Sequence, residues 1–337
     1  MNSTKYLKAD EIQFWLNSSI SLISTVINFI GFYVMIVQKS RESKQFAYFQ
    51  LAYQVILYLS QVYAGSVLNI VFLFPLPGVY CIGFLKNLSG FPALLAFALF
   101  DVLFSVQGAM IAVLMFMKTM AIARPDSPFR MSEMGQKTFI ISLLGGTVAS
   151  QLFVLLASYA SPSEVSSFLH KSYPQMVFLL RYDFLWMLTT NRHFVGLITS
   201  IFVCIGLVFM VVLMSYIILL FELDLQVNSM SKASNKYQRR VVMEFIAHMA
   251  VSMPFYILVP LFIFVKFFLD DSVDVSVESA IVFALFVAAP IPSMLVFLLK
   301  NPTYRAFLIK EFHIPHNKPP AAKATNSRQT PSRVQME

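Results

Sequence analysis

Asp101 is the residue of this sequence whose surroundings most need a chemical explanation. It lies about ten residues inside an apolar stretch, in the segment FALFDVLFSVQG, which at about 1.5 Å of rise per residue places it near the middle of a bilayer. A carboxyl group is unfavourable in hydrocarbon, so acids at this depth usually have a function. It could anchor a ligand, or switch the protein by changing its protonation. It could equally be a protonated group bonded to a neighbouring helix, and the sequence leaves both interpretations open.

Amide side chains form a second set of buried polar candidates. Gln50, Gln54 and Gln61 are separated by four and seven residues, a spacing that puts them on one face of a helix. Because lipid cannot satisfy an amide, that face should point into a helix bundle. We expect these amides, and Gln107 with them, mainly to bond neighbouring helices. Gln61 and Gln107 are also kept as candidate contacts for a ligand or a switch.

Glu244 and His248 lie four residues apart near the start of another apolar segment. They therefore share a helix face and could pair. One interpretation makes them part of a gate that opens toward a partner on that side of the membrane. The other makes them a pair at the membrane interface, and the sequence slightly favours this second interpretation.

Prolines mark the last two apolar segments as bent. Proline removes a backbone hydrogen bond and kinks a helix. Such bends suit a bundle that moves, although static membrane proteins contain them too. The candidate hinges are Pro254, Pro260, Pro290 and Pro292.

The residues expected of an enzyme or a cofactor site are missing. No apolar segment contains a GxGD, GxS or HExxH pattern, and the two cysteines, Cys81 and Cys204, form no CxxC or Cys/His metal pattern. Segment 280–299 has no lysine that could hold retinal. We therefore predict no enzymatic activity, no metal and no cofactor.

Composition indicates that lipid is the solvent around these residues. Hydrophobic residues make up 58% of the 337 residues and charged residues 12%, about half of what a soluble domain carries. The net charge of +8 comes from short clusters between apolar runs and from the tail, which fits membrane topology better than a nucleic-acid surface. The chain is predicted to be an all-α membrane protein, a seven-transmembrane helix bundle. The expected spans are residues 14–37, 46–74, 91–117, 138–160, 194–221, 241–268 and 280–299.

The basic residues predict the orientation of the bundle. Eighteen Lys and Arg residues fall in the loops after the first, third and fifth spans and in the tail, whereas six fall on the opposite side. Since basic residues gather on the cytoplasmic side, the N-terminus should be outside and the C-terminus inside. The glycosylation pattern N-x-[ST] agrees, because Asn2 and Asn87 fall on the outer side. Asn17 also matches, but lies too close to the bilayer for use.

The stretch LLKNPTYRAFLIKEF (298–312) predicts how the last span ends. Lys300 and Arg305 stop translocation, and Pro302 breaks the helix, so Asn301, Pro302, Tyr304 and Arg305 form a membrane-exit motif. Beyond it, apolar residues recur on one face, which predicts a short amphipathic eighth helix (303–312) on the inner leaflet. Residues 1–312 then form one transmembrane domain. The polar, Pro-rich residues 313–337 are expected to be a disordered cytoplasmic tail.

Three stretches of the chain resemble a known family. FLFPLPGVYCIGFL (72–85) is similar to the segment that leads into the third helix of nematode serpentine chemoreceptors, namely the class H and class I receptors of the Str superfamily. FMKTMAIAR (116–124) resembles the inner end of their third helix, although Lys118 replaces a more usual arginine. NPTYR (301–305) looks like the Pro-Tyr-Arg element after their last helix. The likeness covers roughly residues 14–312.

The resemblance implies a G-protein-coupled chemosensory receptor in the plasma membrane, in the cilium of a sensory neuron. A small external ligand would bind among helices three, five, six and seven. A heterotrimeric G protein would contact the basic inner loops 118–137 and 222–240, and a receptor dimer is a further candidate partner. The chain lacks an Asp-Arg-Tyr triplet, so the switch of rhodopsin-like receptors does not transfer residue by residue. The candidate residues of this inner side are Lys118, Arg124, Arg239, Arg240, Glu244 and His248.

A transporter or channel is the alternative from another class. It would show paired half-membrane repeats or several charges along one path. Here only Asp101 lies at mid-membrane, and seven spans do not divide into equal halves. The receptor interpretation is therefore preferred, and the transporter is kept as the alternative.

Overall fold

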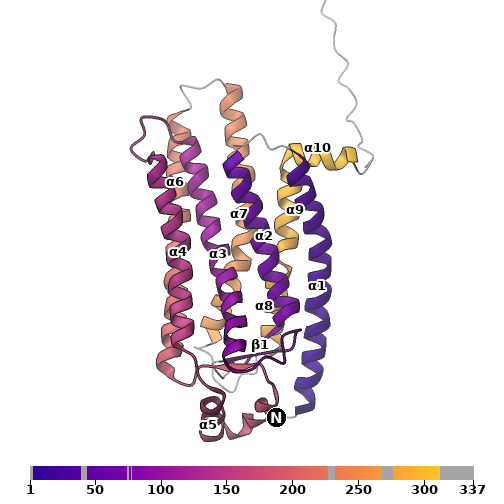
Figure 1. Cartoon of the computed structure of the whole chain (residues 1–337). Coiled ribbons are helices and arrows are strands. Elements are labelled where there is room, and N and C mark those ends of the chain that lie inside the picture. Colours follow the sequence, from indigo (N-terminus) through magenta and orange to yellow (C-terminus); the bar gives the residue numbers. More distant parts are fainter. Residues whose placement is uncertain are drawn as a thin grey trace, which may run out of the picture.

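Seven helices of the computed structural model are long and apolar enough to cross a membrane, as predicted. The structure describes residues 3–38, 44–73, 76, 78–226, 232–266 and 276–311. The spans are side by side in one bundle (Figure 1). They are formed by α1 (Ser3–Val37), α2 (Lys44–Val62) with the π-helical turn η1 (Tyr63–Leu68), α3 (Gly90–Ile122), α4 (Glu133–Ala157), α6 (Asn191–Leu225), α7 (Lys232–Lys266), and α8 (Ser276–Ala288) with α9 (Pro290–Lys300).

Helix α3 is the central element of the bundle and packs against α2, α4 and α6. Its second half is almost completely buried, from Gly108 to Phe116. Small residues such as Gly108, Ala109 and Ala112 allow neighbouring helices to approach it closely. On the outside of the bundle, apolar side chains such as Leu22 and Phe29 are exposed, as expected where the surrounding solvent is lipid.

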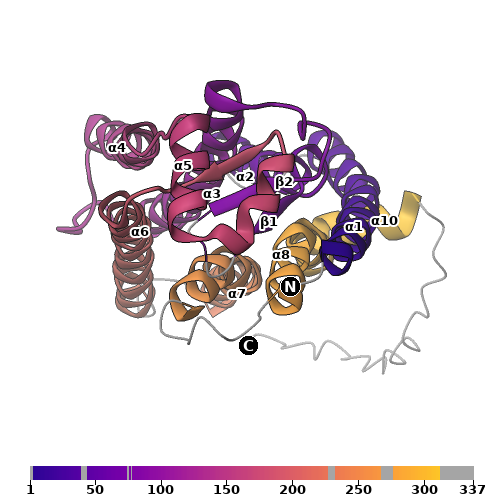
Figure 2. The same cartoon turned by 90° about the horizontal axis from the view of Figure 1, so that it is seen from below.

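A small sheet covers one end of the bundle, which we call the sheet end. Strands β1 (Ile70–Phe72), β2 (Gly78–Cys81) and β3 (Leu185–Met187) pair antiparallel in the order β1-β2-β3. Helix α5 (Pro162–Ser172) and the 3₁₀ helix η2 (Pro174–Arg181) lie beyond the sheet. Seen from this end, the sheet lies across the middle of the bundle (Figure 2). Helix α10 (Pro302–Glu311) is at the opposite end, which we call the tail end (Figure 1).

The second span ends earlier than the sequence indicates. The predicted span 46–74 runs on as helix only to Leu68, and Ile70–Phe72 is strand β1. Asn69 ends the helix because its backbone is left-handed, with φ of 47°, a conformation that asparagine tolerates better than most residues. The Asn69 side chain also accepts a hydrogen bond from Asn17 Nδ2 at 2.9 Å. An apolar strand inside a longer uncharged run cannot be told from helix by hydropathy alone.

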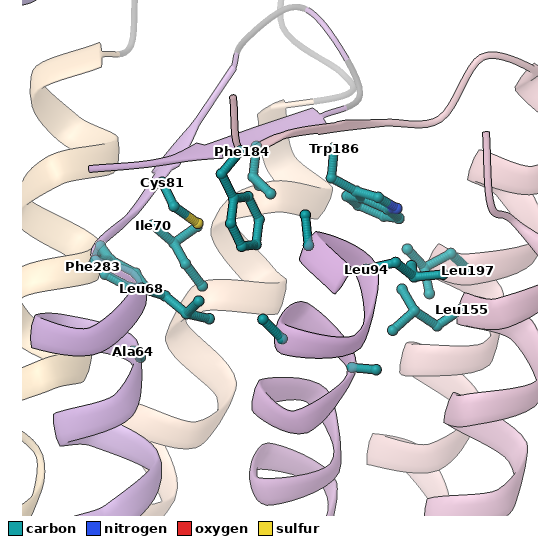
Figure 3. Packing of buried hydrophobic residues seen from close by; sticks show 14 of the residues in the cluster. Ala64, Leu68, Ile70, Cys81, Leu94, Leu155, Phe184, Trp186, Leu197 and Phe283 are labelled. Carbon is teal, nitrogen blue, oxygen red and sulfur yellow. The ribbon is translucent and has the colours of Figure 1, made fainter. Parts of the chain in front are cut away.

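Buried side chains join the sheet to the helices. Figure 3 shows Phe184 and Cys81 directed from the sheet end toward Leu68, Leu94 and Phe283 in the bundle. Both Cys81 and Cys204 are free thiols. Burial raises the pKa of Cys81 well above its usual value, so this thiol remains protonated and packs as an apolar side chain.

The seventh span is broken at the predicted proline. Helix α8 ends at Ala288 and α9 begins at Pro290, because Pro290 has no amide hydrogen to continue the hydrogen-bonding pattern. Pro292 lies in the first turn of α9. Pro254 and Pro260, in contrast, lie inside the continuous helix α7. Whether any of these positions moves as a hinge stays a prediction.

A short helix, α10, follows α9 where the sequence predicts an eighth helix, and its position on the inner leaflet stays a prediction. Asn301 caps it, since Asn301 Oδ1 accepts from the amides of Thr303 (3.0 Å) and Tyr304 (3.4 Å). Pro302 occupies the first helical position, where its missing amide hydrogen does no harm. Tyr304 is buried against α1 and α9, with Phe307 and Leu308 beside it. Arg305 is exposed, and the predicted tail 313–337 and Phe312 lie outside the described residues.

Replacing Asn301 by Ala is expected to loosen the start of α10. The change removes the acceptor for two backbone amides and should cost about 1 kcal/mol of local stability. Hydrogen–deuterium exchange of the purified protein measures this loss, with faster exchange expected at Thr303 and Tyr304. Asn301→Asp keeps the acceptor and should exchange like the wild type. Unchanged protection in Asn301→Ala would show that packing of Tyr304, and not the cap, holds this helix.

Candidate functional site

Asp101 lines a cavity beneath the sheet. The cavity has a volume of about 130 Å³ and is bounded by α3, α6, α7, α8 and the three strands, with Leu155 of α4. Its lining is largely apolar, much of it aromatic, and Asp101 is the one ionisable residue among the lining residues. Helix α3 contributes Phe97, Phe100, Asp101 and Phe104, which are spaced at three or four residues and therefore lie on one helix face.

Aromatic contacts fix the walls of this cavity. Trp186 of β3 stacks on Phe97 with 4.8 Å between ring centroids. Phe286 of α8 contacts Phe100 and Phe104 at 6.1 and 5.8 Å. The strand thus holds a large ring over the face of α3 that carries Asp101. Such contacts are worth about 0.5–1.5 kcal/mol each beyond their burial, so the cavity is held in shape without a ligand.

Two buried polar atoms of the lining residues lack a partner. Within the part of the chain that the structure describes, neither Asp101 Oδ2 nor Trp186 Nε1 makes a hydrogen bond. Buried polar atoms are normally paired, because leaving one unpaired costs about 1–3 kcal/mol. The cavity can therefore hold an apolar molecule whose polar group bonds Asp101. The sequence interpretation that pairs Asp101 with a neighbouring helix finds no such partner among the described residues.

On its other side Asp101 borders a void next to Gln151. The void has a volume of about 10 Å³, close to what one water molecule needs. Gln151 Nε2 donates to Ser200 Oγ and Cys204 Sγ, each at 3.0 Å, while its Oε1 has no partner among the described residues. Sequence reasoning missed Gln151, although an amide inside the fourth span was a signal for it.

Gln61 and Gln107 do not reach the Asp101 cavity. Gln107 Oε1 accepts from Ser60 Oγ at 3.0 Å and from Gln61 Nε2 at 3.3 Å, which joins α2 to α3. Gln50, Gln54 and Gln61 are all buried, so the predicted inward face is right. The geometry favours the interhelical role for Gln61 and Gln107 over contact with a ligand in this cavity.

His248 lies inside the bundle and not at the membrane interface. It is 2% exposed, and its Nε2 is 2.7 Å from Gln54 Nε2 and 3.1 Å from Ser293 Oγ. Ser252 Oγ lies 3.1 Å from the same Ser293 oxygen. This cluster joins α2, α7 and α9. The interfacial position predicted for His248 is therefore wrong. The side chain of Glu244 lies outside the described residues, so their pairing stays a prediction.

Lys118 is not part of an inner loop. Helix α3 continues past the predicted end at residue 117 to Ile122, and Lys118 is 7% exposed. Its ammonium lies 4.8 Å from the ring centroid of Phe46 and 6.0 Å from that of Phe245. Aromatic faces attract a cation, which explains how a lysine is accommodated inside the bundle.

Arg124 is held in an ion pair at the tail end. Arg124 Nε donates to Glu222 Oε2 of α6 at 3.0 Å, and the Arg124 amide donates to the same oxygen at 3.3 Å. Ser127 Oγ donates to Glu222 Oε1 at 2.6 Å. Glu222 is completely buried. Sequence reasoning missed it, having assigned residue 222 to a loop.

The other two candidates on this side are exposed. Arg239 pairs with Asp224 at 2.7 Å, across the gap between α6 and α7. Arg240, the next residue, is also at the surface.

Of the glycosylation candidates, Asn87 is exposed at the sheet end, and Asn2 lies outside the described residues. Asn17 is completely buried.

Comparison with known proteins gives the family. The model of the serpentine type 7TM GPCR chemoreceptor Sri family matches residues 12–308. This range includes all seven spans, the sheet, the Asp101 cavity and most of α10. No curated protein matches the chain. The matched family is one of receptors and not of enzymes. The chain is therefore a multi-pass membrane protein, and it belongs to the Sri family of serpentine seven-transmembrane chemoreceptors, a nematode-type family.

Proposed function

We propose that this chemoreceptor binds a small external ligand in the Asp101 cavity and signals to a heterotrimeric G protein from the tail end. One observation carries the proposal: a preformed aromatic cavity contains a buried carboxyl oxygen that has no partner among the described residues. Ligand pockets are typically apolar, with a few convergent polar groups. The ligand would be a small, mainly apolar molecule with a single group that can donate a hydrogen bond or carry positive charge.

The proposed orientation has the sheet end outside. The distribution of Lys and Arg residues supports it. The exposure of the N-x-[ST] residue Asn87 at the sheet end is consistent with it. We also infer a plasma-membrane location in a sensory cilium, and membership of the Str superfamily, from the resemblance of the three sequence stretches. A receptor dimer remains a prediction on the same basis.

Coupling between the two ends would run through α3. This helix carries Asp101 toward the sheet end, and Thr119 and the Arg124 segment toward the tail end. Thr119 Oγ1 donates to the carbonyl of Ser215 in α6 at 2.9 Å. A ligand that contacts α3 and α6 together would favour one packing of these helices over another, which shifts a pre-existing equilibrium.

The G-protein surface would differ from the one that the sequence suggests. Lys118 is buried, and Arg124 is only about one-third exposed where it pairs with the buried Glu222. The exposed basic side chains at the tail end are therefore the better contacts in the described arrangement. They include Arg130, Lys137, Arg239 and Arg240.

Replacing Asp101 by Asn tests the proposal. A lost charge-assisted contact should lower ligand potency about tenfold or more. Cells that express the chain are screened with a panel of small odorants by calcium or cyclic-nucleotide response. Dose–response curves of the two proteins are then compared at equal surface expression. Asp183→Asn removes an exposed carboxylate at the same end of the molecule, outside the cavity, and should leave potency unchanged.

Two results would contradict the proposal. An unaltered dose–response curve for Asp101→Asn would show that the ligand does not use this carboxyl group. Transport of a solute without any G-protein-dependent response would favour the transporter alternative.

A further inference from the structure

A second and larger cavity lies at the edge of the bundle. Its volume is about 310 Å³, and it is enclosed by α1, β1, η2 and α8. It shares Phe72 and Leu76 with the Asp101 cavity but extends away from it, toward α1. Its lining is mainly aliphatic, so an occupant must be largely apolar. Typical lining residues are Leu16, Val71, Met176, Leu179 and Ala280.

One side of this cavity is polar, around the Asp10 carboxylate. Asp10 Oδ1 accepts from the Tyr80 hydroxyl at 2.5 Å, and Oδ2 accepts from the Tyr182 hydroxyl at 2.7 Å. The two phenol rings stack, with centroids 4.2 Å apart. The carboxylate is thus fixed in place by Tyr80 of β2 and by Tyr182, which follows η2 and is far from Tyr80 in sequence. Such a fixed acceptor can bind a ligand without being reorganised.

Both phenols act as donors to Asp10. Burial raises the pKa of Tyr80, and the neighbouring Asp10 carboxylate raises it further. Burial likewise raises the pKa of Tyr182. The phenols therefore keep their protons, which they donate to Asp10. Asp10 and Tyr80, the two of these residues that line the cavity, are left with acceptor lone pairs. A ligand head that donates hydrogen bonds fits this end, whereas a carboxylate head does not.

The nearest cation does not occupy the acceptor. Arg181 Nη2 donates to the Tyr182 hydroxyl oxygen at 2.7 Å, and its guanidinium lies 4.8 Å from the centroid of the Tyr182 ring. Within the described part of the chain no ion pair joins Arg181 to Asp10 directly, because Tyr182 stands between them. Among the described side chains, the Asp10 carboxylate therefore has no cation paired with it directly.

The cavity opens sideways, toward lipid. Four of its lining residues are apolar and largely exposed on the outer faces of α1 and α8, namely Ile12, Leu16, Val277 and Ile281. Asp10 stands at the start of the first membrane span, and Leu16 lies more than one helical turn deeper. A polar group near the membrane surface and an apolar opening below it match the way an amphiphile stands in one leaflet.

We propose that this cavity binds a single-chain amphiphile with a cationic ammonium head, taken up from the surrounding leaflet. The ammonium donates to Asp10 and the Tyr80 oxygen, both of which line the cavity, and the chain lies between α1 and α8. An ammonium has three donors and a full charge. A neutral alcohol of the same length has one donor and no charge, and should bind less tightly. This site does not depend on what the Asp101 cavity binds.

The test is photolabelling of the full chain in phosphatidylcholine nanodiscs. The probe is dodecylamine with a diazirine near the chain end, and the matched probe carries a hydroxyl group in place of the amine. Mass spectrometry should find the amine probe on α1 near Leu16 and on α8 near Ile281, with excess dodecylamine competing. Asp10→Asn should weaken labelling by the amine about tenfold while leaving labelling by the alcohol unchanged.

A second variant keeps the test independent of Asp10. Ala280→Phe fills the cavity without altering the carboxylate, and should abolish labelling at both helices. Val203→Phe places the same ring on the exposed face of α6 and should not affect labelling. Melting temperatures confirm that the variants are folded. Equal labelling by amine and alcohol, or labelling that survives both Asp10→Asn and Ala280→Phe, would overturn the proposal.

Discussion

Replacement of Glu222 by Gln is expected to raise signalling in the absence of ligand and to lower the stability of the receptor. Glu222 is completely buried and accepts from Arg124 and Ser127, so it ties α6 to the segment after α3. Glutamine keeps the size and one acceptor but removes the charge. Hydrogen bonds to charged groups are worth about 1.5–3 kcal/mol, so a loss of about 2 kcal/mol is expected. The loss is not larger, because Arg124 is about one-third exposed and water can solvate its charge once the partner is gone.

The rise in basal signalling is expected because this contact holds α3 and α6 together on the side proposed for the G protein. If the bundle has an inactive and an active packing, removing a contact that is made only in the inactive packing shifts the equilibrium toward the active one. Basal cyclic-nucleotide or calcium signal is measured at equal surface expression, alongside the melting temperature.

Glu133→Gln is the matched control for this variant. Glu133 pairs with Lys137 at 2.7 Å, but it is 83% exposed, and exposed pairs contribute about 0–1 kcal/mol. Neither signalling nor melting temperature should change noticeably. If Glu222→Gln melts earlier but its basal signal equals that of the wild type, the contact is structural and does not restrain activation.

The sequence predicts the spans well because length and hydropathy are local properties. Some 20 apolar residues are needed to cross a bilayer, and runs of that length are visible in the chain. The helix ends are less predictable. The sequence predicts Lys118 at the start of a loop, because charges usually lie outside the hydrocarbon. Its position between Phe46 and Phe245 depends on three helices that no local pattern relates to each other.

The same limit applies to the polar clusters. Spacing correctly put Gln54 on an inward face, but its neighbours His248 and Ser293 come from α7 and α9. Which residues of distant helices meet depends on their relative rotation and height, and hydropathy does not encode these. His248 was consequently assigned to the interface, although its helix places it next to Gln54.

The Asp101 cavity was predicted only in part. The carboxyl group was identified by its depth in an apolar segment, and the choice of helices three, five, six and seven agrees with the elements around the cavity. Trp186 was not identified, because a strand of three residues gives too short a pattern to be recognised. The Asp10 site was likewise missed, since Asp10, Tyr80 and Tyr182 come together only through the sheet.

Replacement of Gly83 by Ala is expected to disrupt the sheet end and to remove most receptor from the cell surface. Gly83 follows β2, and its amide donates to the carbonyl of Leu68 at 2.9 Å. A Cβ at this position would lie 2.6 Å from the Val67 carbonyl oxygen and 2.7 Å from that of Leu68. These are backbone atoms at the end of η1, so they cannot move aside as a flexible side chain could. The chain after β2 must shift instead, at a cost of about 1–3 kcal/mol.

The shift would reach the Asp101 cavity, because β2 supplies Gly78 and Val79 to its lining. The Gly83→Ala receptor that still reaches the cell surface should therefore respond to ligand with reduced potency.

Gly145→Ala is the matched control, since a Cβ at this position in α4 meets nothing within 4 Å. Alanine favours a helix over glycine by about 1 kcal/mol, so the control should be as stable as the wild type or more so. Surface staining and melting temperature compare the three proteins. Equal surface levels and melting temperatures for Gly83→Ala and wild type would mean that the segment after β2 can move away from η1, and that the sheet is not rigidly fixed over the Asp101 cavity.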